Sequence, residues 1–251
     1  MILDLFKLDG RAALVTGARR GLGQAIAYGL AQAGADVCGV SRHADHEETR
    51  RLVESCGRRF ACWGADLSQP GERAGIVERA VDELGRIDIL VNNAGSGTRH
   101  PPENYPLSEF VALLETHLVA AFDLAQQAAR RMLPRGRGKI INIGSVMSFE
   151  GGLNIPAYAA AKHGIAGLTK SLAVAWSGKG INVNCIAPGY FETNLLLRDD
   201  PVRGPQILDR IPAGRWGNPD EIQGLAVFLA SDASNYMHGS IVEIDGGWLA
   251  R

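Results

Sequence analysis

The sequence predicts a three-layer α/β fold in which helices cover both faces of a seven-stranded parallel sheet. Two observations favour this doubly wound arrangement. Short apolar runs alternate with longer segments of helical periodicity along the whole chain of 251 residues. In addition, a glycine-rich turn at 16–23 joins the first apolar run to the first helical segment. Since α/β chains of this length often fold as one unit, we expect a single domain over 1–251.

The predicted strands are short and mostly apolar, because the strands of a covered parallel sheet are buried on both faces. They lie at 12–15, 36–40, 59–63, 87–91, 139–143, 181–186 and 240–244. The segments between them have helical periodicity, which predicts helices at 22–33, 46–56, 72–84, 107–132, 157–177 and 220–231. The stretch 190–216 has no clean period and contains three prolines. A long excursion of this kind in a compact domain is typical of a functional segment, so we expect a substrate lid there.

The composition argues against several classes of protein. The 26 basic and 27 acidic residues give a formal net charge of -1, which offers no footprint for nucleic acid or an anionic membrane. The chain has no apolar run near the roughly 18 residues of a membrane-spanning helix, and no cationic signal peptide. The four cysteines lack CxxC spacing and the six histidines lack zinc-site spacing. We therefore expect a cytoplasmic protein with reduced thiols and no bound metal, whose partners are a small-molecule substrate and copies of itself.

The glycine-rich turn at 16–23 has the features of a phosphate-binding loop. Gly17, Gly21 and Gly23 let the backbone turn sharply and approach a pyrophosphate, and the helix that follows offers free amide donors at its start. The spacing between these glycines differs from the Gly-x-Gly-x-x-Gly pattern of longer dehydrogenases. The strand before the turn and the helix after it nevertheless predict a Rossmann fold that binds a dinucleotide.

The residues after the second predicted strand favour NADP as the cofactor. In dinucleotide-binding units an acidic residue near this point usually accepts a hydrogen bond from the ribose 2′-hydroxyl. This chain instead has Ser41 and Arg42, and Arg20 lies in the glycine-rich turn. A guanidinium and a hydroxyl suit a 2′-phosphate. Because surface arginines commonly face solvent, NAD remains the alternative.

A second group of residues indicates proton transfer at a carbonyl. Tyr158 and Lys162 are four residues apart on a predicted helix and share one face, so the ammonium can favour the ionised phenol. Ser145, at the end of the fifth predicted strand, can stabilise charge on a substrate oxygen. With a nicotinamide cofactor, these residues predict hydride transfer to or from a hydroxyl or keto group of a small polar substrate. A Tyr/Lys pair by itself is ordinarily only a solvated helix face.

Taken together, the motifs resemble those of the short-chain dehydrogenase/reductase family over essentially the whole chain. The matching segments are the turn at 16–23, Asp66, the Asn-Asn-Ala-Gly run at 92–95, Ser145, Tyr158 with Lys162, and Pro188-Gly189 followed by Thr193. The resemblance implies an NAD(P)-dependent enzyme whose catalytic residues are Ser145, Tyr158 and Lys162, and which assembles as a homotetramer. The expected cofactor contacts are Gly17, Arg19, Arg20, Gly21, Leu22, Gly23, Ser41, Arg42, Asp66, Leu67, Asn93, Ala94, Gly95, Tyr158, Lys162, Pro188, Gly189 and Thr193.

One position departs from the family pattern. Many relatives have an asparagine on the long fourth helix that holds a water in the proton relay to the lysine, whereas this chain has His117. A neutral imidazole can still donate or accept a hydrogen bond, so His117 is a further catalytic candidate. A packed histidine without a catalytic part is the alternative.

Within the family, the chain is most similar to sugar-acid dehydrogenases, notably at 207–217 and in the tail at 245–251. This likeness implies a sugar acid as substrate and a preference for NAD, which conflicts with Arg42. The basic residues that could bind a substrate carboxylate are Arg99, His100, Arg198 and Arg203. Two other functions stay open: a non-catalytic dinucleotide sensor, and a ketoreductase that acts on a non-sugar carbonyl.

Overall fold

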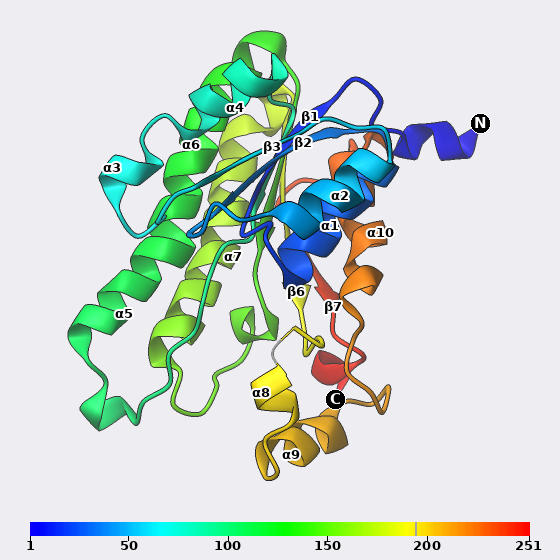
Figure 1. Cartoon of the computed structure of the whole chain (residues 1–251). Coiled ribbons are helices and arrows are strands. Elements are labelled where there is room, and N and C mark those ends of the chain that lie inside the picture. The colour runs from blue at the N-terminus through cyan, green and yellow to red at the C-terminus, as the bar shows by residue number, and fades with distance from the viewer. Residues whose placement is uncertain (194) are drawn as a thin grey trace.

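Seven parallel strands form the centre of the protein, in the order β3-β2-β1-β4-β5-β6-β7 (Figure 1). This computed structural model describes residues 1–193 and 195–251. The strands are β1 (Ala12–Thr16), β2 (Asp36–Ser41), β3 (Phe60–Gly64), β4 (Ile89–Asn92), β5 (Gly138–Ile143), β6 (Ile181–Pro188) and β7 (Ile241–Ile244). Each lies within two residues of its predicted position, so the predicted doubly wound parallel sheet is confirmed.

The strand order reverses between β1 and β4, which are neighbours in the sheet although β2 and β3 separate them in the chain. Leu14 of β1 lies beside Leu90 of β4, so the loops that follow these two strands diverge from adjacent points. In doubly wound sheets, ligands bind at this switch point, beyond the carboxyl ends of the strands. The topology therefore places the glycine-rich turn and the loop after β4 at the two sides of one crevice.

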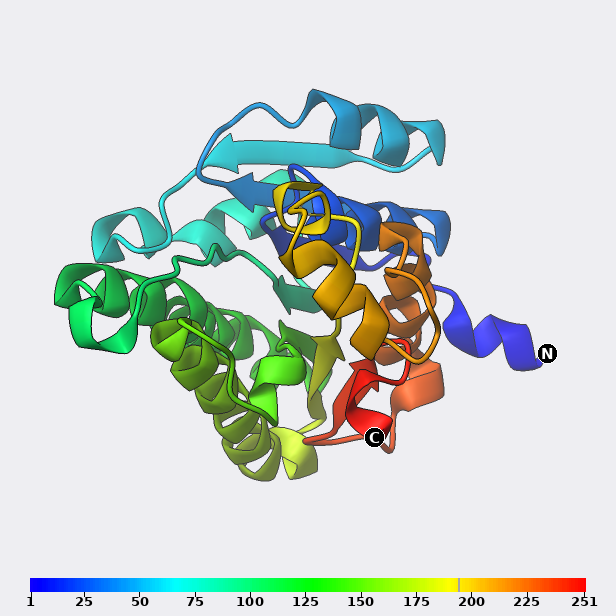
Figure 2. The same cartoon turned by 90° about the horizontal axis from the view of Figure 1, so that it is seen from below.

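Helices cover both faces of the sheet, and each layer has its own apolar core (Figures 1 and 2). One face is covered by α1 (Gly21–Gln32), α2 (Glu47–Ser55) and α10 (Gln223–Ala230). The other is covered by α4 (Ile76–Leu84), α6 (Ala120–Met132) and α7 (Pro156–Trp176). The helices and the sheet together make the predicted three layers.

Three helices differ from their predicted extent. The segment predicted as one helix at 72–84 is two, α3 (Pro70–Arg73) and α4, because Gly75 lies between them with a φ of 76°. The segment at 107–132 is α5 (Leu107–Leu114), a π-helical turn at Glu115–Val119, and α6. The segment at 220–231 begins as a 3-10 turn, Pro219–Ile222, before α10. Periodicity located these helices but did not show where the backbone changes its winding.

The segment at 190–216, predicted as a substrate lid and without a clean period in the sequence, contains two short helices. These are α8 (Leu195–Arg198) and α9 (Arg203–Arg210), which project below the carboxyl ends of the strands in Figure 1. Position 194, inside the predicted lid, lies outside the described residues. Ile207 of α9 packs in one apolar cluster with Trp216 and Trp248, so α9 rests on the carboxyl-terminal tail.

Two kinds of feature are absent from the described residues. No helix in 1–193 or 195–251 is both long and apolar enough to cross a membrane. The same residues contain no group of three or more histidine, cysteine, aspartate or glutamate side chains arranged to hold a metal ion.

Candidate active site

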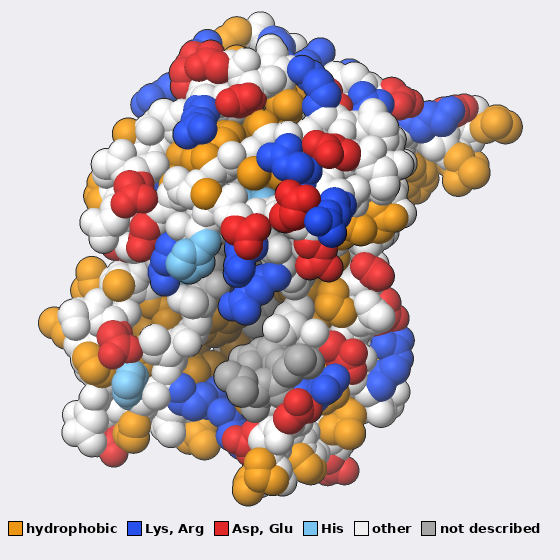
Figure 3. Space-filling model, in the orientation of Figure 1, with side chains coloured by type: hydrophobic (Ala, Val, Ile, Leu, Met, Phe, Trp, Pro, Cys, Tyr) orange, Lys and Arg blue, Asp and Glu red, His pale blue; other side chains and the backbone are white. Residues whose placement is uncertain are grey.

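A cleft of about 910 Å³ lies at the carboxyl edge of the sheet, where the topology places a ligand site. Figure 3 shows a hollow in the middle of this face, with basic side chains gathered around it. Every residue that the sequence predicted as catalytic or cofactor-binding lines this cleft. The sequence did not predict eight further lining residues, which are His43, Ala65, Ser96, Gly97, Thr116, Ile143, Gly144 and Phe191. Most of them directly follow a strand or adjoin a predicted residue, so their position in the sequence could have identified them.

The glycine-rich turn has the close backbone packing that a phosphate loop requires. Gly17 has a φ of 69°, a conformation that residues with a side chain rarely adopt. A Cβ at Gly23 would lie 2.2 Å from the carbonyl oxygen of Gly17, so only glycine fits there. Since α1 begins at Gly21, its first amide groups lie free at the cleft and can bind an anion. The turn therefore fits the pyrophosphate of a dinucleotide.

Thr16, the last residue of β1, ties the glycine-rich turn to the loop after β4. Its hydroxyl accepts hydrogen bonds from the backbone N–H groups of Asn93 (2.9 Å) and Ala94 (3.0 Å). The side-chain amide of Asn93 in turn donates to the carbonyl of Thr16, at 2.9 Å. Thr16 is not among the site residues that the sequence predicted, although it directly precedes the first glycine. These hydrogen bonds fix the position of the glycine-rich turn relative to the loop after β4.

The side chains expected at the adenosine end of the cofactor lie together, but two of them are paired with each other. The Arg42 Nε lies 3.3 Å from the Asp66 Oδ2, in an ion pair that solvent can reach. Arg19 donates from its Nε to the carbonyl oxygen of Asp45, at 3.1 Å. No carboxylate takes the place of Ser41 and Arg42 after β2, so this end of the cleft suits a 2′-phosphate better than a 2′-hydroxyl.

The three predicted catalytic side chains meet on the other side of the cleft. Ser145 follows β5, and its Oγ accepts a hydrogen bond from the backbone N–H of Met147 at 3.1 Å. Tyr158 and Lys162 lie on successive turns of α7, and the Lys162 Nζ is 5.4 Å from the centroid of the Tyr158 ring. Lys162 also donates to the carbonyl oxygen of Ile143, at 2.7 Å. Tyr158 forms a hydrogen bond with Ser145, so hydroxyl, phenol and ammonium form one group.

The electrostatics of this group differ from the expectation that the lysine lowers the pKa of the tyrosine. Burial raises the pKa of Tyr158, and the hydrogen bond with Ser145 lowers it only in part. Burial also lowers the pKa of Lys162 to about 8. The prediction counted the attraction between phenolate and ammonium but not the cost of taking both charges out of water. In this structure the phenol is therefore protonated at neutral pH and ready to act as a proton donor.

His117 lies in the π-helical turn, against Tyr158. Its ring makes an edge-to-face contact with Tyr158, with centroids 5.4 Å apart. Burial, helped by the charge of Lys162, lowers the pKa of His117 to about 3, so the imidazole is neutral. Its Nε2 lies 2.7 Å from the carbonyl oxygen of Ser96 and must donate, because a carbonyl only accepts. A Cβ at Gly95 would lie 2.0 Å from the ring, so only glycine lets the loop after β4 pass over this histidine.

A small cavity lies behind the cleft, and His117 is part of its lining. The cavity measures about 10 Å³, and its lining includes Thr16, Asn92, His117 and Lys162. The His117 Nδ1 and the Asn92 Oδ1 are both buried and accept no hydrogen bond from a described protein group. A space of this size, lined in part by polar side chains, is just sufficient for one water molecule.

Two arginines, Arg99 and Arg203, lie near Tyr190, outside the lining of the cleft. Burial lowers the pKa of the Arg99 guanidinium and the charge of Arg203 lowers it further, which places two cations close together. Neither guanidinium forms an ion pair with a carboxylate in the part of the chain that the structure describes, although Arg99 donates a hydrogen bond to the carbonyl oxygen of Leu153. The other two candidates for a carboxylate anchor are already paired: His100 with Glu109 (2.9 Å), and Arg198 with acidic neighbours in the lid. The tyrosine ring is held between Trp216 and Trp248.

Comparisons with known proteins agree with this geometry. The family model described as "Enoyl-(Acyl carrier protein) reductase" matches residues 17–249. The 2-dehydro-3-deoxy-D-gluconate 5-dehydrogenase of Bacillus subtilis is 51% identical over 99% of this chain and 98% of its own. A gluconate 5-dehydrogenase from Burkholderia cenocepacia, solved with NADP and tartrate, is 40% identical over 100% of both chains, with a TM-score of 0.93. An Agrobacterium tumefaciens protein, assigned as a 2-deoxy-D-gluconate 3-dehydrogenase and solved with NADP, is 47% identical over 99% of this chain and 100% of its own, with a TM-score of 0.92.

Proposed function

Because this chain belongs to the short-chain dehydrogenase/reductase family, we propose that it is an NADP-dependent oxidoreductase acting on a sugar acid. It interconverts a hydroxyl and a keto group of a small, carboxylate-bearing substrate. The observation that carries this proposal is the group formed by Ser145, Tyr158 and Lys162 at one end of a cleft whose other end fits a dinucleotide. A sensor that only binds a dinucleotide has no need of such a proton-transfer group.

Each catalytic side chain has a separate task. The nicotinamide, when bound, supplies or accepts the hydride. Ser145 donates a hydrogen bond to the substrate oxygen and stabilises the negative charge that develops there. Tyr158 passes its phenolic proton to that oxygen in reduction and takes it back in oxidation. Lys162, which is 4% exposed, holds a positive charge beside the phenol and stabilises the phenolate left after the proton has moved.

His117 takes part in the reprotonation of Tyr158. In this proposal its Nδ1 and the Asn92 Oδ1 hold one water molecule in the cavity of about 10 Å³, next to Lys162. The neutral imidazole accepts from that water while its Nε2 stays bound to Ser96. The relay then runs from Tyr158 through Lys162 to the water, with the histidine as its anchor in place of the asparagine of many relatives.

The cofactor proposal is supported by charge at the adenosine end of the cleft. Arg19, Arg20 and Arg42 all line it, and a guanidinium binds a phosphate through charge-assisted hydrogen bonds. The relatives from B. cenocepacia and A. tumefaciens were both solved with NADP. NADP is therefore the cofactor that this chain's residues and its relatives both support.

The substrate proposal is supported by the two arginines near Tyr190. Arg99 comes from the loop after β4 and Arg203 from α9 of the lid, so a carboxylate between them would join the lid to the body of the protein. The B. cenocepacia relative was solved with tartrate, which is a hydroxy acid. Binding of a substrate carboxylate at this point would leave its hydroxyl or keto carbon free to face Tyr158.

The organisation of the protein is part of the same proposal. We place the whole chain in one domain, with 190–216 as its substrate lid, in the cytoplasm. A homotetramer is supported by large apolar side chains that lie exposed on α5, α6 and α7, which are Leu107, Val111, Phe122 and Val174. Such faces commonly pack between subunits.

The test is turnover with a panel of substrates, followed by NADPH or NADH absorbance. Keto sugar acids, neutral keto sugars and diketones form the panel, and we expect turnover with the acids. Tyr158→Phe keeps the ring and its packing, so it should bind NADPH as tightly as the wild type and lose turnover. Turnover of the diketones alone would favour the non-sugar ketoreductase. Tight cofactor binding without turnover of any substrate would favour the sensor.

A further inference from the structure

A buried histidine lies behind the adenosine end of the cleft, in the turn between β2 and α2. His46 is 3% exposed, and its Nε2 lies 2.9 Å from the Oγ of Ser41. Its Nδ1 lies 3.0 Å from the carbonyl oxygen of Ala44. We infer that His46 is a positioning residue for recognition of the 2′-phosphate, because its protonation decides whether the Ser41 hydroxyl hydrogen points inward or into the cleft. This inference depends on the proposed use of NADP.

The hydrogen bonds around His46 determine where each hydrogen lies. The carbonyl of Ala44 can only accept, so the Nδ1 carries a hydrogen in every state. In a neutral imidazole the Nε2 is then an acceptor, and the Ser41 hydroxyl must donate to it. The Ser41 Oγ meanwhile accepts from the backbone N–H of Arg19, at 3.3 Å. With neutral His46, the hydroxyl hydrogen of Ser41 is therefore held away from the cleft.

Protonation of the imidazole reverses the direction of this bond. The Nε2 of a protonated His46 donates to the Ser41 Oγ, which releases the hydroxyl hydrogen to turn toward the cleft that Ser41 lines. One hydrogen cannot serve both the imidazole and a phosphate. If Ser41 donated to a phosphate while His46 stayed neutral, a buried ring nitrogen would lose its only hydrogen-bond donor, which is unfavourable. Recognition of the phosphate by Ser41 and protonation of His46 are therefore linked.

Burial, helped by two neighbouring arginines, favours the neutral imidazole before a phosphate binds. Burial lowers the pKa of His46, and Arg19 from the glycine-rich turn and Arg50 from α2 add to this. The hydrogen bond to Ala44 and the carboxylate of Asp45 oppose it only in part. A phosphate anion near Ser41 raises the same pKa. Binding therefore takes up a proton, and the preference for NADPH falls as pH rises through the raised pKa.

The experiment compares the dissociation constants of NADPH and NADH for the protein without substrate, by nucleotide fluorescence from pH 6 to pH 8.5. In the wild type we expect the preference for NADPH to fall about tenfold over this range, since one charge-assisted hydrogen bond is lost. His46→Asn keeps an amide donor for Ala44 but cannot reach Ser41. This variant should retain its melting temperature and show a preference that the imidazole no longer makes pH-dependent. Ionisation of the phosphate itself is common to both proteins, so the difference between them isolates the histidine.

Two further variants make the test decisive. His43→Gln removes the exposed histidine of the same turn, which lines the cleft directly, and should keep the pH dependence. Loss of the dependence in His43→Gln but not in His46→Asn would overturn the inference, as would the same pH dependence in the wild type and in His46→Asn. Ser41→Ala removes the other end of the bond, should also lose the dependence, and decides the matter if His46→Asn does not fold. Equal affinity for NADH and NADPH at every pH would instead overturn the proposed cofactor, and the inference with it.

Discussion

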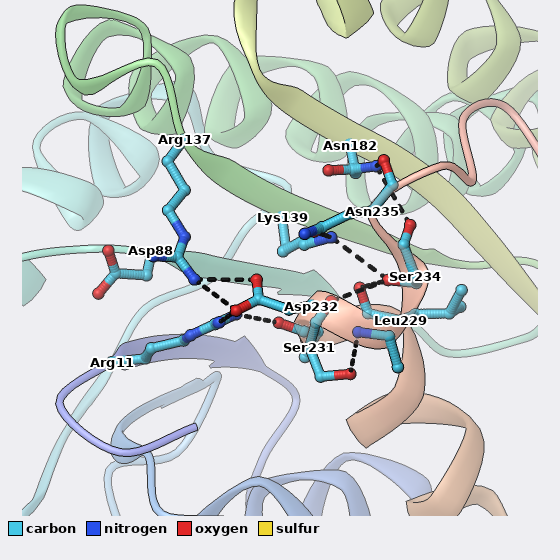
Figure 4. A network of polar contacts seen from close by, with 12 residues as sticks. Arg11, Asp88, Arg137, Lys139, Asn182, Leu229, Ser231, Asp232, Ser234 and Asn235 are labelled. Atoms are coloured by element: carbon cyan, nitrogen blue, oxygen red, sulfur yellow. Dashed lines mark hydrogen bonds and ion pairs between the residues drawn. The ribbon is translucent and has the colours of Figure 1, made fainter. Parts of the chain in front are cut away.

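Two lysines are buried near opposite ends of the parallel strands, and burial lowers the pKa of each to about 8. Lys162 lies at the carboxyl edge, in the wall of the cleft, beside the phenol of Tyr158. Lys139 lies at the amino end of β5, and its Nζ donates to the Asn235 Oδ1 (2.8 Å) and the Ser234 Oγ (3.3 Å) (Figure 4). The two ammonium groups are almost alike in burial and pKa, yet they have different neighbours.

The difference shows that a shifted pKa does not by itself identify a catalytic group. Lys139 does not line the cleft, and two side chains of the protein accept hydrogen bonds from its ammonium. Asp232 lies nearby and binds Arg11 and Arg137, so charges of both signs surround this lysine (Figure 4). Lys162 instead faces a proton-transfer group and an open cleft. Function follows from what lies beside the lysine and from its access to a ligand.

The largest effect that we expect separates the two lysines by turnover. Lys162→Met removes the charge that stabilises the phenolate of Tyr158, and kcat should fall by about 10²- to 10⁴-fold. Lys139→Met should leave kcat and KM unchanged, because the side chain lies far from the cleft lining. Steady-state kinetics of both variants, with melting temperatures as the control for folding, provide the measurement. Equal losses of kcat would mean that the two lysines do not differ in function.

The second prediction concerns Lys139 and the pH dependence of folding stability. Its pKa is about 8 in the folded chain and about 10.4 when unfolded. Between these values the unfolded state binds the proton and the folded state does not, so folding stability rises as pH increases from about 8 to 10. This contribution is roughly 3 kcal/mol. In urea unfolding, the free energy of unfolding of the wild type should increase relative to that of Lys139→Met over this pH range. A difference independent of pH would argue against the burial of a charged lysine.

Sequence patterns located this fold well, because strands and turns leave local signals. Consecutive apolar residues mark each buried strand, and the residues that follow a parallel strand meet at one edge of the sheet. This is why Ser145, Tyr158 and Asn93, far apart in the chain, could be assigned to one site from the sequence alone. The position of each of these residues relative to the predicted strands and helices can be recognised in the sequence.

The features that sequence patterns missed arise from packing between distant segments. The raised pKa of Tyr158 depends on how completely neighbouring elements exclude water, and residue spacing does not contain that information. The π-helical turn at Glu115–Val119 interrupts a continuous helical period without any proline or glycine to mark it. The contact between His46 and Ser41 likewise depends on how the turn after β2 folds back. Such features can be identified only from the three-dimensional structure.

The third prediction concerns the proposed relay behind Lys162 and has a smaller effect. His117→Leu removes the acceptor that faces the small cavity, and kcat should fall about tenfold, the equivalent of one lost hydrogen bond. His117→Asn offers an amide at the same turn and should recover part of the rate. KM should stay constant in both variants, because His117 does not touch the substrate end. Equal kcat for the wild type and the leucine variant would assign the histidine a packing role alone.

The smallest effect that we expect lies in the ion pairs near Lys139. Asp232 accepts from Arg11 at 2.8 Å and from Arg137 at 2.9 Å, and solvent reaches the carboxylate. Burial would raise the pKa of Asp232, but the two arginines outweigh it and hold the pKa below its usual value. Because exposed ion pairs contribute little, Asp232→Asn should cost about 1 kcal/mol or less at neutral pH, and less again in high salt. The carboxylate also raises the pKa of Lys139, so its loss should move the alkaline rise in stability to lower pH. Asp82→Asn, an exposed position on α4, is the matched control and should leave that rise where it is. An unmoved rise in Asp232→Asn would mean that the charge of Asp232 does not act on the buried lysine.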